Sequence, residues 1–198
     1  MRKLLGLALL GILAAAAPAR ADIERKATIG CDVNGNGQIC FYIWPALPGL
    51  PGWHQDQAAS YHYSANILVP DGQNFANAPI ALTGNVVAED GYKTDHPRAN
   101  AVDGFIEDDI ANTRRDNPDA EVTEVEGATA ADGRKLRVFV FHKLKGGHVQ
   151  ALTYTEDGDH DGKFFVMLML DSLTDEGLET GMPVFRQMVG KYKHWKAS

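Results

Sequence analysis

Acidic residues at alternate positions give the clearest chemical signal in the sequence. Residues 157–162 are Asp-Gly-Asp-His-Asp-Gly, which matches the start of a calcium-binding loop, because alternate carboxylates can converge on a hard cation where glycine lets the chain curl. Asp157, Asp159 and Asp161 are therefore candidate metal ligands. The motif also needs a bidentate glutamate at its twelfth position, where this chain has Leu168. The pattern predicts at most a weak calcium site, and the alternative is an ordinary turn built from the same residue types.

The same pattern occurs a second time, between the only two cysteines, Cys31 and Cys40. Residues 32–37 are Asp-Val-Asn-Gly-Asn-Gly, and Ile43 takes the place of the glutamate. In an oxidising compartment an isolated pair of cysteines is expected to form a disulfide. A redox pair would usually be Cys-x-x-Cys, and a lipid anchor would need Cys31 directly behind the apolar leader, so both alternatives are weaker.

Histidines and aromatic residues offer two further possibilities. The seven histidines lack the spacing of a zinc or copper site, although His142 and His148 flank one predicted turn and His160 is placed at the opposite end of the sheet. No motif of a serine or cysteine nucleophile is present, so we assign no catalytic residues. Four aromatic residues in a proline-rich stretch are candidates for a binding surface, and they could equally cover one face of a sheet: Trp44, Trp53, Tyr61 and Tyr63.

The N-terminal residues predict export. Arg2 and Lys3 precede a short apolar stretch, and residues 19–21 are Ala-Arg-Ala, the small-x-small pattern of signal peptidase cleavage. Residues 1–21 are thus expected to be a signal peptide, which places the protein in the periplasm or outside the cell, with no membrane insertion after cleavage. The remaining chain has 16 basic and 26 acidic residues, a net charge of −10, which argues against nucleic acid as a partner.

Hydrophobic periodicity predicts a single α+β domain over residues 60–198, preceded by a Gly/Pro/Trp-rich segment over residues 22–59 without regular elements. We expect strands over residues 66–70, 79–87, 121–129, 136–142, 149–155 and 164–170, and helices over 100–115 and 174–193. The last strand is apolar throughout, so it should be central and covered on both faces. Asn100 is the expected N-cap of the first helix, and Ser172 with Asp175 resembles a capping box for the second. The segment Gly181–Pro183 should kink the second helix or start it.

Turn residues set the expected order of the last four strands. Asp132-Gly133 between two apolar runs is a strong hairpin signal. If the four strands form a meander, the Asp132 turn and the turn at 157–161 lie at the same end of the sheet and gather negative charge there. The fold expected is an antiparallel sheet covered by helices.

This order of elements resembles the PsbP-like and DcrB-like superfamily of exported α/β/α sandwich proteins, over roughly residues 60–193. The resemblance is carried by the helix at 102–110, the Asp132-Gly133 hairpin, the strand at 164–170 and the closing pattern Phe185-x-x-Met188-Val189-x-x-Tyr192. It implies a non-catalytic binding or assembly protein of the bacterial-type envelope with an envelope protein as partner. The alternative is a weak divalent-cation-binding protein, or a small cation-dependent enzyme, that uses the acidic sheet edge and has no other cofactor.

Overall fold

The computed structural model describes residues 23–29, 39–95 and 101–195. These residues form nine strands: β1 (Ile23–Ile29), β2 (Ile39–Pro45), β3 (Trp53–Gln55), β4 (Asn66–Pro70), β5 (Ile80–Ala88), β6 (Glu121–Thr129), β7 (Lys135–His142), β8 (Val149–Asp159) and β9 (Gly162–Ser172). They also form four α-helices: α1 (Gln57–Tyr63), α2 (Glu89–Asp95), α3 (Val102–Asp116) and α4 (Asp175–Lys191). The predicted signal peptide, Cys31 and the pattern at 32–37 lie outside the described residues.

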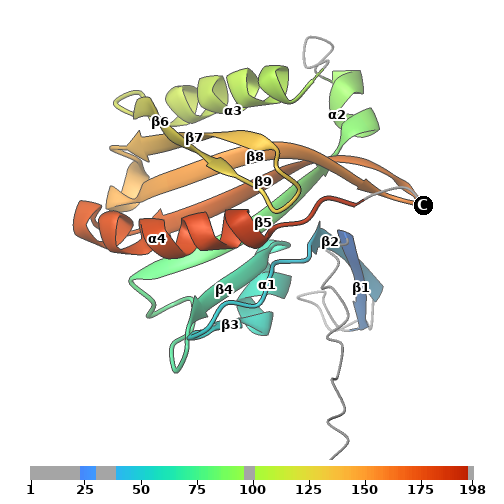
Figure 1. Ribbon diagram of the computed structural model, residues 1–198, viewed down its shortest axis with the longest axis horizontal. Coiled ribbons are helices and arrows are strands. Elements are labelled where there is room, and N and C mark those ends of the chain that lie inside the picture. The colour runs from blue at the N-terminus through green and yellow to red at the C-terminus, as the bar shows by residue number, and fades with distance from the viewer. Residues whose placement is uncertain (1–22, 30–38, 96–100, 196–198) are drawn as a thin grey trace, which may run out of the picture.

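Seven of the strands form one antiparallel sheet in the order β3-β4-β5-β9-β8-β7-β6 (Figure 1). The prediction of a central strand at 164–170 is confirmed, because β9 lies in the middle of this order. Phe165, Val166, Leu168 and Leu170 in β9 are completely buried. The predicted meander of β6 to β9 is confirmed as well.

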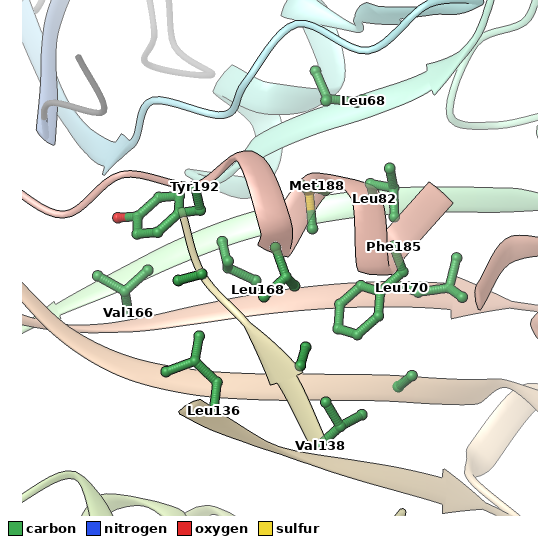
Figure 2. Packing of buried hydrophobic residues seen from close by; sticks show 14 of the residues in the cluster. Leu68, Leu82, Leu136, Val138, Val166, Leu168, Leu170, Phe185, Met188 and Tyr192 are labelled. Atoms are coloured by element: carbon green, nitrogen blue, oxygen red, sulfur yellow. The ribbon is translucent and has the colours of Figure 1, made fainter. Parts of the chain in front are cut away.

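Alternation along the strands separates two apolar faces. In β7, Val138 and Val140 belong to a cluster with Phe185 and Met188 of α4, as Figure 2 shows for part of this core. Phe139 and Phe141, which alternate with them, belong to a second cluster with Phe105 and Ile106 of α3. Successive side chains of a strand point to opposite faces, so α4 and α3 cover opposite faces of the sheet (Figure 1). The α+β class with an antiparallel sheet is confirmed.

The ends of the helices differ from the predictions. Helix α4 is capped by Thr174, whose side chain accepts from the Gly177 N–H at 3.0 Å. The predicted Ser172 capping box is wrong, because the Ser172 hydroxyl binds the backbone of Thr174 instead. The helix runs continuously through Pro183 from Asp175, so it does not begin near Gly181. Helix α3 begins after Ala101, which has no side-chain cap, and the predicted N-cap Asn100 lies outside the described residues.

The N-terminal segment is more regular than predicted. Strands β1 and β2 form an antiparallel hairpin, and β3 extends the main sheet beside β4. The expected boundary at residue 60 falls inside α1. Strand β2 forms because residues 39–44 are Ile-Cys-Phe-Tyr-Ile-Trp, a run of residues that favour strands. The glycines and prolines on either side led to the prediction of an irregular segment.

This segment packs directly on the sheet. Trp44 is only 1% exposed, and the Asn66 side chain in β4 donates to the Pro45 carbonyl at 3.0 Å. A Cβ on Gly84 of β5 would lie 2.7 Å from Pro45 Cγ and 2.8 Å from Leu47 Cδ2. The close approach therefore needs glycine at position 84. No helix in the described part of the chain has the length and apolar character needed to cross a membrane.

Candidate functional site

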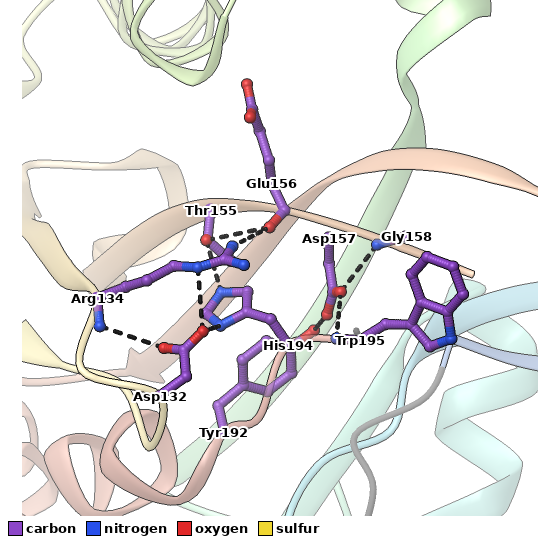
Figure 3. Close-up of polar contacts among 9 residues, drawn as sticks. All are labelled: Asp132, Arg134, Thr155, Glu156, Asp157, Gly158, Tyr192, His194 and Trp195. Atoms are coloured by element: carbon purple, nitrogen blue, oxygen red, sulfur yellow. Dashed lines mark hydrogen bonds and ion pairs between the residues drawn. The ribbon is translucent and has the colours of Figure 1, made fainter. Parts of the chain in front are cut away.

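The two acidic turns lie at one end of the sheet, as the meander predicted. Arg134, which follows the Asp132-Gly133 turn, donates to the Glu156 carbonyl of β8 at 2.9 Å (Figure 3). The chain that leaves α4 also reaches this end and brings Tyr192, His194 and Trp195 into contact with both turns. The site thus combines two hairpin turns with a C-terminal segment.

Asp157 holds the C-terminal segment rather than a cation. Its Oδ2 accepts from the Tyr192 hydroxyl at 2.6 Å, and its Oδ1 accepts from the Trp195 and Gly158 N–H groups at 2.8 Å each. Burial and the nearby Asp157 carboxylate raise the pKa of Tyr192, which keeps the phenol protonated as a donor. The predicted metal set must be corrected, because Asp157 does not belong to the group of donor atoms around Asp159 and Asp161. Both of its oxygens already accept hydrogen bonds, from Tyr192, Trp195 and Gly158.

Asp159 and Asp161 form a tight turn paired with an arginine. Asp159 Oδ1 accepts from the N–H groups of Asp161 at 2.8 Å and Gly162 at 3.0 Å. Arg25 of β1 approaches Asp159 Oδ2 at 2.8 Å and Asp161 Oδ2 at 3.2 Å. Donor atoms of Asp159, His160 and Asp161 do lie within 4.8 Å of one another. The guanidinium supplies positive charge to this acidic group, so a divalent cation would have to compete with Arg25.

His194 is a buried ionisable group at this end of the sheet. Its Nε2 lies 2.7 Å from Thr155 Oγ1, and its Nδ1 lies 2.9 Å from Asp132 Oδ2 without the angles of a hydrogen bond. Burial lowers the pKa of His194, and the charge of Arg134 lowers it further against the opposing effect of Asp132 and Asp157. Burial raises the pKa of Asp132, but the Arg134 N–H and the charges of His194 and Arg134 outweigh it and lower the pKa.

Asp132, His194 and Thr155 place a carboxylate, an imidazole and a hydroxyl in the order of a nucleophilic triad. Their role here is structural, because the hydroxyl is buried. Thr155 is 4% exposed, and a nucleophile must reach its substrate. The imidazole instead joins β8 to the Asp132 turn. A depression of about 520 Å³ beside this cluster is lined by residues of both charges, among them Arg134, Asp159, Asp161 and Lys163. The expected gathering of acidic residues is present, but basic side chains lie among them.

The predicted aromatic surface separates into buried and exposed parts. Trp44 is buried and packs against Tyr61, with ring centroids 5.5 Å apart, so it cannot contact a partner. Trp53 packs against the main core. Of the four candidates only Tyr63 is strongly exposed, at 56%. Trp44 is therefore an interior residue, and Trp53 is partly buried against the core from strand β3.

A different aromatic residue, Phe41, has the highest exposed fraction among the large hydrophobic side chains of the described residues. Phe41 in β2 is 79% exposed and Ile39 is 53% exposed. These two side chains alternate with Cys40, so they lie on one face of the hairpin, together with Ala27, which pairs with Phe41 across the ladder. We call Ala27, Ile39 and Phe41 the hairpin face. Cys40 is not a free thiol; its predicted partner Cys31 lies outside the described residues, so the disulfide stays a prediction.

Histidines 142 and 148 do not form a common site. His142 Nδ1 lies 3.0 Å from Asp175, whereas His148 Nδ1 lies 2.9 Å from Asp171. His160 is at the opposite end of the sheet, as predicted, since it occupies the turn between β8 and β9. In the described residues no group of three metal-binding side chains includes His142 or His148.

Sequence reasoning missed Thr155, His194 and Trp195 as members of one cluster. The contacts join β8 to residues about forty positions later, and no local pattern encodes such a contact. The only signal is the run Tyr-Lys-His-Trp directly after an amphipathic helix. No protein-family model matches the sequence, and no curated protein is significantly similar to it.

Proposed function

We propose that this protein is an exported, non-catalytic binding or assembly protein of the bacterial-type envelope. In this proposal it engages another envelope protein through the hairpin face. The observation that carries the proposal is the exposure of Phe41 and Ile39 side by side on a strand that is otherwise anchored to the domain by Trp44. Adjacent exposed apolar side chains of this size are typical of protein interfaces, where aromatic residues contribute a large share of the binding energy.

The polar residues of the acidic end of the sheet are assigned a structural role in this proposal. Asp157, Asp159 and His194 each have a partner within the protein, and these contacts tie the C-terminal segment and β1 to the sheet. We therefore assign them to the stability of the domain. A PsbP-like or DcrB-like arrangement is part of the same proposal, since members of that superfamily are mostly binding or assembly factors.

A divalent cation is the second candidate ligand. It is favoured by the approach of donor atoms from Asp159, His160 and Asp161 to within 4.8 Å. The three side chains supply too few ligands for calcium, which takes six to eight oxygens, and Arg25 pairs with two of them. Such a site would be weak and of the extracellular kind.

Affinity purification from envelope extracts tests the main proposal. The wild-type protein should retain one partner reproducibly, and Phe41→Ser should lose it by at least about tenfold, as expected for an aromatic residue at the centre of an interface. Leu173→Ser is the control, because Leu173 is another exposed hydrophobic residue, at 53%. It follows β9, at the end of that strand away from the Asp159 turn. Equal recovery with Phe41→Ser and wild type would contradict the proposal.

A further inference from the structure

A cavity of about 390 Å³, open to the surface, lies on the α3 face of the sheet, away from both sites described above. Its floor consists of alternate residues of three neighbouring strands, since Thr83 pairs with Met169 and Gln150 pairs with Asp171 across the ladders. Its wall includes Thr113 and Asn117 at the end of α3, with Leu144, Lys145 and His148 from the turn after β7. The volume is within the range of small-molecule sites.

A histidine and an aspartate form a dyad in this cavity. His148 Nδ1 lies 2.9 Å from Asp171 Oδ2 and 3.1 Å from Oδ1. Gln150 Nε2 donates to the same carboxylate at 2.7 Å, which fixes its orientation. A carboxylate accepts hydrogen bonds only, so we place the imidazole proton on Nδ1, and Nε2 then carries the lone pair. Nε2 forms no hydrogen bond with another described residue, which makes it an acceptor for a hydroxyl.

Two further features define what could bind. Lys145 brings an ammonium to the rim, and its backbone N–H donates to Asn117 Oδ1 at 2.8 Å, which holds the turn against α3. Among the described residues no carboxylate forms an ion pair with Lys145. Apolar surface comes from Leu144, Met169 and Phe75. The cavity thus combines an anion-binding group, a hydroxyl acceptor and an apolar wall.

We propose that this cavity binds a small hydroxy acid with an apolar substituent. The carboxylate of the ligand pairs with Lys145, its hydroxyl donates to His148 Nε2, and its apolar part packs on Met169. Glycine at position 146 keeps this side of the imidazole accessible, because a Cβ there would lie 3.2 Å from His148 Cδ2 and 3.6 Å from Nε2. The site is independent of the hairpin face, which lies near the Asp159 end of β9, whereas Asp171 lies near the other end.

Nuclear magnetic resonance titration with mandelate tests the proposal on the exported protein. Mandelate should shift the imidazole resonances of His148 in a saturable way, with a dissociation constant of about 1 mM, as is usual for so small a ligand. Phenylacetate lacks the hydroxyl and benzyl alcohol lacks the carboxylate, so each should bind at least about fivefold more weakly, the effect of one lost hydrogen bond or ion pair.

Variants decide whether the named residues are responsible. His148→Gln and Lys145→Gln should each weaken mandelate binding at least about fivefold, and the second change is at an exposed position. His142→Gln is the matched control, because His142 flanks the same turn but pairs with Asp175 and does not line the cavity. Absence of saturable binding to wild type, or an affinity equal to that of wild type in both cavity variants, would overturn the proposal.

Discussion

The Asp157 carboxylate attaches the C-terminal segment to the sheet. It is buried near the end of β8 and accepts hydrogen bonds from the Tyr192 hydroxyl and from the backbone N–H groups of Trp195 and Gly158. Tyr192 and Trp195 belong to the segment after α4. Hydrogen bonds to a charged acceptor contribute about 1.5–3 kcal/mol each to the free energy of unfolding. A carboxylate that loses such a partner keeps its desolvation cost, so the loss exceeds the value of the bond itself.

Replacing Tyr192 by phenylalanine should destabilise the protein. The change removes only the hydroxyl that donates to Asp157 at 2.6 Å and leaves the buried ring in place. We expect the free energy of unfolding to fall by about 2 kcal/mol, measured by urea denaturation. Tyr63→Phe is the control, since Tyr63 is exposed and should change the free energy of unfolding by less than about 0.5 kcal/mol. Equal effects of the two changes would show that the Asp157 contact is unimportant.

His194 should make the protein sensitive to mild acid. Burial and Arg134 lower its pKa below the ordinary value of 6.5, so in mild acid the unfolded chain binds a proton that the folded protein does not. Stability therefore falls as the pH drops through 6.5 towards the folded-state pKa, and it is fully present above that window.

The measurement compares urea denaturation at about pH 7.5 and pH 5.5. His194→Gln should be less stable at the higher pH, because the contact with Thr155 changes, and it should lose less stability on acidification than wild type. His160→Gln should keep the wild-type dependence, since His160 is exposed in the turn between β8 and β9. If His194→Gln loses as much stability on acidification as wild type, a group other than His194 is responsible for the pH dependence.

At the scale of elements, the parts encoded locally were predictable and the long-range contacts were not. The Asp132-Gly133 turn has Gly133 at φ 88°, a conformation that glycine adopts without strain, so the hairpin could be predicted from two residues. The apolar run of β9 indicated its central position in the same way. By contrast, the packing of Pro45 and Leu47 on Gly84 joins residues about forty positions apart. The hydrogen bond between His194 and Thr155 also joins residues about forty positions apart.

Gly84 offers a test of how the N-terminal segment is attached. Gly84→Ala would place a Cβ 2.7 Å from Pro45 Cγ, so the segment must shift. Overpacking of this kind costs about 1–3 kcal/mol, and we expect a lower melting temperature and faster proteolysis before residue 53. Gly91→Ala is the control, because nothing lies within 4 Å of a Cβ there and α2 should gain slightly from alanine. An unchanged melting temperature in Gly84→Ala would mean that residues 44–47 do not pack tightly on β5.

The whole molecule has two dissimilar ends. One end of the sheet is closed by β1, the acidic turns and the C-terminal segment, whose contacts join parts of the chain far apart in sequence (Figure 1). The other end holds the cavity of His148 and Asp171. The hairpin face and this cavity therefore present different chemistry in different directions, which fits a protein that binds partners.

Calcium should not stabilise the molecule appreciably. A ligand at a hundred times its dissociation constant adds about 2.7 kcal/mol to the free energy of unfolding, but Arg25 already pairs with Asp159 and Asp161. We expect the melting temperature with 1 mM calcium to equal that with EDTA within about 1 °C. A larger shift that disappears in the double variant Asp159→Asn, Asp161→Asn would establish the cation site and contradict this account of the acidic turns.

Photo-cross-linking in the producing cells tests the central claim most directly. A photoreactive amino acid at position 41 should form one discrete adduct with an envelope protein, because this side chain is the most exposed part of the hairpin face. The same group at position 173 should form none, although Leu173 is an exposed hydrophobic residue too. No adduct at position 41, or the same adducts at both positions, would contradict the assignment of the hairpin face as the binding surface.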